Sequence, residues 1–430
     1  MKIVVVGTGY VGLVTAAIMA KFNHQTVGLD IDALKIKKLN QGKPPFFEAG
    51  LEDLLQAGIK KKRLSFTTSY RSAITGAQVV FICVGTPSKD SGEIDLSYIK
   101  QACKSVARAM KGPLLLAIKS TVPPGIQTVI KPIIKQHTKY DFDLVTCPEF
   151  LREGSAVEDS LHPDRIIIGA ENDKAASIIL KLHQSIKAPK HVFDINSAQL
   201  VKYSANAFLA NKISFANQIA NLCDRVGADA KLVMFGLGLD RRIGKDFLNP
   251  GLGFGGSCFP KDNAAISFLA KQHGFSLIMV DTARNINEQQ VDIVFNKLVK
   301  LLGPLKGKTV AVLGLAFKPG TDDMRQARSV PLIKNIVKAG ARVRVYDPAA
   351  ISNARRFLKS LKIIYSTSAY HAIETADAMV LVTEWPEFAK LNFKAIKRLM
   401  KQAIVVDGRN LFEPAKLKKL GFKYLGVGRR

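Results

Sequence analysis

The first thirty residues contain the feature that most constrains the fold, a glycine-rich turn between an apolar strand and a helix. Residues 2–6 (KIVVV) form the short apolar run of a buried parallel strand, and the turn GTGYVG follows at residues 7–12. Residues 13–22 predict a helix, and the next apolar run, residues 26–29, ends in Asp30. Strand, GxGxxG turn, helix, strand and acid in this order predict a dinucleotide-binding Rossmann unit.

Each glycine of this turn has its own role in binding a dinucleotide. Gly7 permits the tight turn, Gly9 lets the pyrophosphate touch the backbone, and Gly12 lets the helix pack on the strand. The helix N-terminus adds partial positive charge for the phosphates. Asp30 is placed to bind both ribose hydroxyls of NAD, and its charge would repel the 2′-phosphate of NADP. The other cofactor candidates here are Tyr10, Val11 and Lys35, the last of which could instead be a surface lysine.

Three further apolar runs predict more strands of the same sheet: residues 78–84, 114–118 and 143–146. In doubly wound sheets, ligand groups sit just beyond the carboxyl ends of the strands. Thr86, Thr121 and Glu149 all follow such ends. Any one of them could be ordinary turn chemistry, but three beside a dinucleotide fingerprint favour a site. We therefore expect Thr86 and Thr121 to contact the cofactor.

Two carboxylates lie close together in the segment that follows the last of these strands. If that segment turned helically, Glu149 and Glu153 would share one face. Two carboxylates so close would raise the pKa of one, which suits a general base or a group that holds water. The alternative is a solvent-exposed acidic pair.

A long stretch without proline or glycine, residues 197–226, predicts one long helix. It carries too many apolar residues for one narrow stripe, so we expect burial on more than one side, which would suit a dimer interface. Lys202 and Asn206 are neighbours at i,i+4, and such polar groups on an apolar helix are costly unless partnered. They are candidates for an oxyanion or alkoxide site. Alternatively, they lie on a polar outer stripe with Asn211 and Asn217.

A second glycine-rich segment, NPGLGFGGSCFPKD, occupies residues 249–262. Its four glycines and two prolines predict a loop. The glycines would let backbone N–H groups approach a phosphate closely. Cys258 could then be a nucleophile beside an anchored anion, or the segment could be a flexible linker with an incidental buried cysteine. Residues 263–300, which follow, look helical.

Residues 308–430 repeat the plan of the first unit. Apolar runs at residues 308–314 and 343–347 match the first two strands, and runs at 376–382 and 403–408 match later ones. The second unit lacks GxGxxG, so we expect it to bind something other than a dinucleotide. Basic residues near its predicted strand ends could hold the phosphates or base of a nucleotide: Lys318, Arg325 and Arg409.

Composition excludes several classes of protein. The five cysteines form no CxxC pair, which argues against a zinc ribbon or a disulfide framework and fits a reducing, cytoplasmic location. We expect no metal site. No apolar run approaches about 18 residues, so no membrane span is expected. The net charge of +28 is spread over runs that we interpret as solvated helix faces. None interleaves aromatic residues, so no specific nucleic-acid partner is predicted.

Six motifs together resemble the UDP-glucose 6-dehydrogenase family of nucleotide-sugar dehydrogenases, over nearly the whole chain. They are GTGYVGL at residues 7–13, STVPPG at 120–125, PEFLREG at 148–154, KYxxN at 202–206, GFGGSCFPKD at 253–262 and FKPGTDDMR at 317–325. The resemblance implies an α/β fold: two Rossmann-like, doubly wound parallel-sheet domains joined by a central helical domain with one long helix. The expected domains are an NAD-binding domain at residues 1–195, a helical dimerisation domain with the catalytic loop at 196–300, and a UDP-sugar-binding domain at 301–430.

The resemblance also implies a four-electron oxidation of UDP-glucose to UDP-glucuronate by two molecules of NAD. Cys258 matches the nucleophile that captures the C6 aldehyde as a thiohemiacetal, which is then oxidised to a thioester. Lys202 and Asn206 would stabilise the developing alkoxide, and Asp262 would tune the lysine and the bound water. The same chemistry on GDP-mannose or UDP-N-acetylmannosamine is the nearest alternative. A two-electron hydroxyacid dehydrogenase and a non-catalytic binding protein are more distant ones.

The resemblance assigns roles to the remaining candidates. Thr121 and Glu149 would position water, with Glu149 as general base for hydrolysis, and Glu153 would lie near substrate and NAD. Arg325 matches a residue that reaches an NAD phosphate, and Arg242 matches an arginine donated across a homodimer interface. The glucose pocket and the UDP contacts would be formed by Phe150, Leu151, Phe247, Leu248, Asn249, Gly251, Gly255, Phe317, Lys318 and Arg409.

Overall fold

A computed structural model describes all residues from 1 to 430, and the chain forms two compact units. The first contains Met1–Ala205 and Ala264–His273, and the second contains Asn206–Asn263 and Gly274–Arg430. Two of the three points of division fall inside helices, after Ala205 in α9 (Ile195–Val226) and after Asn263 in α11 (Phe259–Gln272).

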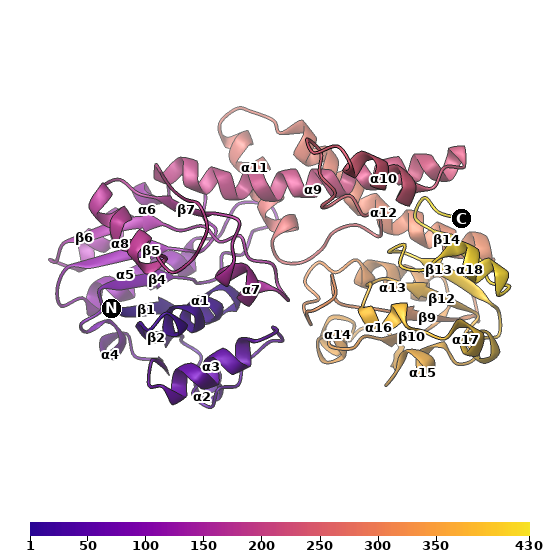
Figure 1. Cartoon of the computed structure of the whole chain (residues 1–430), viewed down its shortest axis with the longest axis horizontal. Coiled ribbons are helices and arrows are strands. Elements are labelled where there is room, and N and C mark those ends of the chain that lie inside the picture. The colour runs from indigo at the N-terminus through magenta and orange to yellow at the C-terminus, as the bar shows by residue number, and fades with distance from the viewer. The chain divides into compact units, whose positions relative to one another are not determined.

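The first unit is built on an eight-stranded sheet in the order β3-β2-β1-β4-β5-β6-β7-β8 (Figure 1). Its strands are β1 (Lys2–Val6), β2 (Gln25–Leu29), β3 (Leu64–Thr67), β4 (Val79–Ile82), β5 (Leu114–Ile118), β6 (Phe142–Thr146), β7 (Ile166–Gly169) and β8 (Lys190–Phe193). Neighbouring strands are parallel except β6 and β7, which meet at one antiparallel pair, Thr146 and Gly169. The order of connection reverses between β1 and β4, and ligands of such sheets bind at this switch point.

Helices cover both faces of this sheet, which explains why its strands are apolar throughout. Alternate residues of β1 face opposite layers: Ile3 and Val5 pack under α1, α3, α7 and α8, whereas Val4 and Val6 pack under α4, α5 and α6. The helices of the unit are α1 (Tyr10–Lys21), α2 (Ala33–Leu39), α3 (Leu51–Lys60), α4 (Tyr70–Ile74), α5 (Ser97–Ala109), α6 (Ile126–His137), α7 (Ala156–Leu161) and α8 (Asp173–Leu182).

The second unit contains a six-stranded, wholly parallel sheet in the order β11-β10-β9-β12-β13-β14. This order repeats that of the first six strands of the larger sheet, so the predicted repeat is confirmed. The strands are β9 (Thr309–Leu313), β10 (Arg342–Tyr346), β11 (Ile363–Tyr365), β12 (Ala378–Leu381), β13 (Ile404–Asp407) and β14 (Lys423–Gly426). The helices around them are α13 (Ser329–Lys338), α14 (Ile351–Phe357), α15 (Ala369–Ile373), α16 (Pro386–Ala389), α17 (Phe393–Leu399) and α18 (Pro414–Lys419).

The central helical region contains the predicted long helix, α9, with 32 residues. The remaining helices are α10 (Ala230–Gly238), α11 and α12 (Ile278–Leu302). Two expectations are corrected. The helical stretch after residue 262 is two helices, because the chain turns at Gly274, where φ is +71°. The glycine-rich loop ends before Phe259 rather than at Asp262, because Pro260 fits the first turn of a helix, whose N–H groups need no intrahelical partner. None of the helices combines the length and the apolar character that a membrane crossing requires.

Candidate active site

The glycine-rich turn at residues 7–12, called the cofactor turn below, requires glycine at two positions because of packing within the protein. A Cβ on Gly7, where φ is +93°, would lie 2.8 Å from the carbonyl oxygen of Cys83. A Cβ on Gly12 would lie 1.9 Å from the carbonyl oxygen of Gly7. A Cβ on Gly9 would meet no protein atom within 4 Å, so packing does not explain that glycine. Close approach of a pyrophosphate to the start of α1 does explain it, and these residues therefore fit a dinucleotide.

Asp30 follows β2 and forms the acidic end of this cofactor site. Its carboxylate accepts hydrogen bonds from the backbone N–H of Thr8 (2.9 Å) and the Thr8 hydroxyl (2.8 Å), and pairs with the Lys35 ammonium at 2.9 Å. Burial alone would raise the pKa of Asp30, but Lys35 and the hydrogen-bond donors outweigh it and hold that pKa below its usual value. Lys35 thus pairs with Asp30 and is not isolated on the surface.

The second unit has a glycine and an acid at the positions equivalent to Gly7 and Asp30, but the protein itself occupies the space around them. Gly314 repeats Gly7 with φ of +86°, and a Cβ there would lie 2.4 Å from Thr383. Asp347 follows β10 as Asp30 follows β2, but it is only 1% exposed. One oxygen of Asp347 accepts from the backbone of Leu315 (2.7 Å) and from the indole of Trp385 (3.1 Å), and the other accepts two backbone N–H groups. This carboxylate is fully engaged by the protein.

The buried ion pair between Glu149 and Lys202 is the main polar feature at the carboxyl ends of the first sheet. Glu149 Oε1 lies 2.9 Å from Lys202 Nζ, and Oε2 accepts from the Leu151 N–H at 2.7 Å. The two charged side chains are 5% and 3% exposed. Burial would raise the pKa of Glu149, but the Lys202 ammonium outweighs it and lowers that pKa.

This geometry corrects three sequence interpretations. The segment from Glu149 to Glu153 is not helical, so the two carboxylates are not i,i+4 neighbours on one helix face. The charge that acts most on the pKa of Glu149 is the Lys202 cation, which lowers it. Both carboxylates are buried, at 6% and 9% exposure, so the exposed acidic pair is also wrong. The polar outer stripe is wrong as well, because Lys202, Asn206 and Asn217 are buried.

The neighbouring strand ends place the other candidates of the first unit. Thr86, Thr121 and Glu149 follow β4, β5 and β6, which are adjacent in the sheet, so the topology brings them to one edge. Ser120 ties two of these ends together, because its hydroxyl donates to the Val84 carbonyl at 2.7 Å.

The ring of Phe150 lies beside the buried ion pair. The Arg165 guanidinium stands 3.9 Å from the ring centroid, and the Lys202 ammonium stands 5.6 Å from it. The sequence analysis did not single out Arg165, since a lone arginine near the start of a strand gives no local signal.

Cys258 lies in the second unit, directly before α11, and is half-buried. Its carbonyl accepts the N–H of Asp262 at 2.8 Å, so it occupies the N-terminal end of that helix, where the partial positive charge favours a thiolate. Three other cysteines contrast with it: burial raises the pKa of Cys83 and Cys103 to about 12 and that of Cys147 to about 11. Among the cysteines, Cys258 therefore combines exposure with a favourable field.

Asp262 anchors a second polar cluster one helical turn from Cys258. Its carboxylate accepts from the Asn206 amide at 2.6 Å and pairs with the Lys261 ammonium at 2.6 Å. Asp262 is 1% exposed and Asn206 is 7% exposed. The predicted catalytic residues thus fall into two groups: Thr121, Glu149 and Lys202 in the first unit, and Asn206, Cys258 and Asp262 in the second.

The glycine-rich loop is packed against its own unit and is not a flexible linker. A Cβ on Gly253 would lie 2.5 Å from Asn287 Oδ1, and a Cβ on Gly255 would lie 2.4 Å from the Gln326 carbonyl oxygen. Asn287, a buried residue of α12, holds the loop through both its amide oxygen and its amide nitrogen, which bond the backbone of Phe254. Asn287 was not among the residues predicted from the sequence, and its signal is a polar residue on an apolar helix face.

Arg409 lies at the end of β13 and holds the same loop. Its guanidinium donates to the carbonyls of Val382 (2.8 Å) and Gly253 (3.1 Å). The other basic candidates have local partners: Lys318 stands 5.7 Å from the Phe317 ring centroid, and Arg325 pairs with Asp323 at 2.7 Å. Arg242, whose side chain is 90% exposed, pairs with Asp240.

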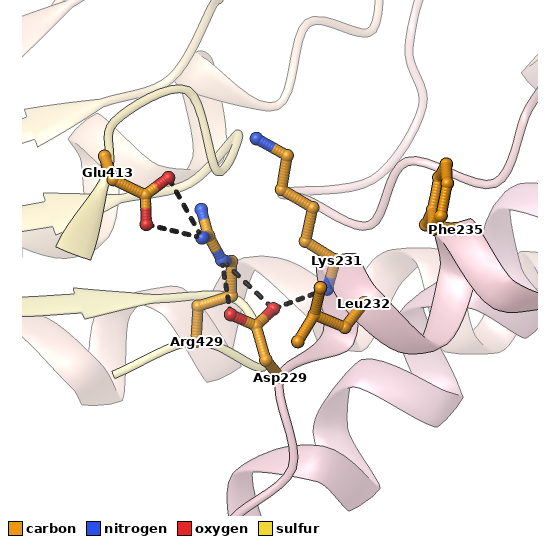
Figure 2. Close-up of a pocket in the computed structure, with 6 residues that line it drawn as sticks. All are labelled: Asp229, Lys231, Leu232, Phe235, Glu413 and Arg429. Atoms are coloured by element: carbon orange, nitrogen blue, oxygen red, sulfur yellow. Dashed lines mark hydrogen bonds and ion pairs between the residues drawn. The ribbon is translucent and has the colours of Figure 1, made fainter. Parts of the chain in front are cut away.

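A pocket of about 360 Å³ lies elsewhere in the second unit (Figure 2). Arg429 lines this pocket and pairs with Asp229 and Glu413, each at 3.2 Å. The pocket is lined by Asp229, Lys231, Leu232, Phe235, Glu413 and Arg429. None of the predicted site residues lines it, and its arginine is already neutralised by two carboxylates, so we assign it no ligand.

Comparison with known proteins identifies one family whose three domains match successive regions of the chain. Residues 1–187, 196–289 and 311–414 match the NAD binding, central and UDP binding domains of the UDP-glucose/GDP-mannose dehydrogenase family. UDP-glucose 6-dehydrogenase TuaD of Bacillus subtilis (strain 168) is 44% identical over 100% of this chain and 93% of its own length. The UDP-glucose 6-dehydrogenase of Rickettsia conorii is 41% identical over 100% and 99%.

Solved structures agree with the sequence relatives. A UDP-glucose dehydrogenase from Pyrobaculum islandicum superposes with a TM-score of 0.93 at 38% identity, covering 100% of this chain and 98% of that one. A UDP-D-ManNAc dehydrogenase from Pyrococcus horikoshii gives 0.88 at 30% identity, with 100% and 99% coverage.

Proposed function

We propose that this chain, which belongs to the UDP-glucose/GDP-mannose dehydrogenase family, oxidises UDP-glucose to UDP-glucuronate and reduces two molecules of NAD⁺. The observation that carries the proposal is Cys258 at the N-terminus of α11, one turn from an Asp262 that is bonded to Asn206. A two-electron alcohol oxidation would need no such cysteine. The curated relatives are named for UDP-glucose, which favours this sugar over the alternatives.

In the first oxidation, the hydroxyl proton at C6 must leave while the C6 hydride moves to the cofactor. NAD⁺ held at residues 7–12 and Asp30 would supply the hydride acceptor. Lys202 and Asn206, one turn apart on α9, would stabilise the developing alkoxide, and one such donor is typically worth about 3 kcal/mol of the barrier. Thr86, Thr121, Glu153 and Arg325 would complete the cofactor contacts.

The second half of the reaction would pass through Cys258. Its thiolate forms a C–S bond to the aldehyde carbon, and the carbonyl oxygen takes a proton to give a thiohemiacetal. Transfer of a second hydride to the second NAD⁺, with release of that proton to solvent, would give a thioester. Water then adds to the thioester carbon, loses a proton to Glu149, and expels the thiolate as the carboxylate forms. The lowered pKa of Glu149 keeps it ionised at neutral pH, so Lys202 must move off it before it accepts the proton.

The substrate contacts follow from the same assignment. Phe150 and Leu151 would line the glucose pocket, and residues 247–255 would surround the diphosphate. Phe317, Lys318 and Arg409 would complete the UDP side. The domain boundaries at residues 195 and 300, and a cytoplasmic location, remain predictions.

The substrate preference is tested by NADH formation with a panel of nucleotide sugars. We expect kcat/KM for UDP-glucose to exceed that for GDP-mannose and UDP-N-acetylmannosamine by at least about 100-fold, because buried polar groups built for one sugar are left unpaired by another. No NADH from UDP-glucose, with turnover of either other sugar, would reassign the substrate.

We further propose a homodimer formed through α10 and the part of α9 that belongs to the second unit. Large apolar side chains of the kind that partner surfaces cover are exposed on α9 and on α10 with its C-terminal cap residue: Phe208, Phe215, Leu222, Leu232, Phe235 and Leu239. The three on α9 recur every seven residues and so share one face. Arg242, exposed just beyond α10, is well placed in the chain to reach a second copy.

Phe215→Glu should separate the dimer, because it places a charge in an apolar interface. We expect its dissociation constant, measured by analytical ultracentrifugation, to rise more than about 100-fold, with loss of turnover as the partner's arginine leaves the site. Tyr98→Glu on α5, also at an exposed aromatic residue but outside the patch, should leave both unchanged. A variant that stays dimeric would place the interface elsewhere.

A further inference from the structure

We propose that Glu48 is a positioning residue that fixes the segment of residues 149–154 against the cofactor turn. Glu48 lies in the loop between α2 and α3 and is 5% exposed. Its Oε2 accepts the Gly154 N–H at 2.6 Å, and its Oε1 accepts the Ala156 N–H at 2.7 Å. One side chain thus binds two backbone groups more than 100 residues away in sequence.

A carboxylate is required at this position by the chemistry of its partners. Both partners are backbone N–H donors, so both side-chain oxygens must accept. A glutamine could offer one oxygen, and its amide nitrogen would face the second N–H. A buried donor without an acceptor is destabilising, so Glu48→Gln should release one of the two anchors.

Tyr10 connects the same anchor to the cofactor turn. Tyr10 is the first residue of α1, and its hydroxyl oxygen also accepts the Gly154 N–H, at 2.8 Å. Its ring stacks on Phe46 with centroids 4.5 Å apart, and Phe46 belongs to the same loop as Glu48. The loop therefore holds both Tyr10 and the turn at Gly154, and all of these residues lie in the first unit.

The held segment contains residues with proposed roles in the reaction. At its start, Glu149 pairs with Lys202, and at its end, Arg152 pairs with Asp159 at 2.6 Å. Glu48 fixes Gly154 and Ala156, which follow these two ion-paired residues in the chain. Loosening that end would displace Glu149 and Phe150, and misplacement of about 1 Å in an active site can cost roughly 100-fold in rate. Because Glu149 is proposed as the base for thioester hydrolysis, the loss should fall on that step.

The inference rests on the proposed function for its kinetic readout but not for its structural one. We compare Glu48→Gln with Glu52→Gln, an exposed glutamate in the first turn of α3. With UDP-glucose and NAD⁺, we expect Glu48→Gln to keep a rapid burst of NADH and then turn over at least about 10-fold more slowly, with a covalent sugar adduct detectable by mass spectrometry. By hydrogen exchange without ligands, the amides of residues 149–156 should exchange faster in Glu48→Gln alone.

Two results would overturn the inference. The first is equal hydrogen exchange at residues 149–156 in both variants. The second is a burst of NADH that is reduced by the same factor as the steady-state rate. The burst counts folded sites, so that result would mean that Glu48 only supports folding. If Glu48→Gln does not fold, Tyr10→Phe provides the same comparison, because it removes the hydroxyl that accepts the Gly154 N–H. Wild type without turnover would contradict the proposed function and leave the exchange test intact.

Discussion

We expect Cys258→Ser to reduce multiple turnover by more than about 10⁴-fold, while NAD and UDP-glucose still bind with nearly unchanged affinity. The expectation follows from the position of Cys258 at the start of α11, where the helix favours a thiolate but cannot ionise a serine hydroxyl at neutral pH. Loss of a catalytic nucleophile removes the covalent route completely, and effects of this size are usual for it. Stopped-flow absorbance of NADH measures the rate, and calorimetry measures the two affinities.

A matched control separates this chemistry from packing. Cys223→Ser alters a buried cysteine of α9 in the same unit and should leave turnover per folded molecule within a few fold. Normal turnover by Cys258→Ser would contradict the assignment of the nucleophile. The assignment would also be contradicted if Cys258→Ser lost its affinity for NAD and UDP-glucose while its remaining turnover ran at the wild-type rate.

Glu149→Gln is expected to stop the reaction at a different point. The variant keeps the size of the side chain and an acceptor for Lys202 or for the Leu151 N–H, but it cannot accept a proton from water. Removing a general base costs about 10²- to 10⁴-fold, here in the hydrolysis of the thioester. We expect two NADH per site to form rapidly, followed by very slow turnover. Because the pKa of Glu149 is lowered in the wild type, its base form should persist below the ordinary glutamate range of about pH 4.3.

The sequence predicted the parts of the fold that have a local signature. The strands β1, β2, β4, β5 and β6 are apolar runs of the kind that parallel sheets bury on both faces, and the second sheet repeats them. The strands β3, β7 and β8 were not predicted. β8 reads KHVF with three of its four residues exposed, so it has neither an apolar run nor a clean alternation.

The candidate site was predictable where a motif names the residue and was not where the contact is long-range. Cys258, Lys202 and Glu149 stand in motifs, and the structure adds what holds them: Asp262 beside Asn206, and the ion pair of Glu149 with Lys202. The pKa of Glu149 is lowered because its nearest charge is the Lys202 ammonium, and sequence spacing cannot show which charge lies nearest. Glu48 gave no signal at all, because its role depends on two backbone groups far away in the chain.

The central claim is that Cys258 carries the sugar as a covalent acyl group before water releases it. The most direct measurement is the intact mass of Glu149→Gln after mixing with UDP-glucose and NAD⁺, with peptide mapping of the modified residue. We expect one UDP-sugar acyl group per chain, located on Cys258 and absent when the same chain also carries Cys258→Ala. An unmodified protein that has nevertheless produced two NADH per site would contradict it.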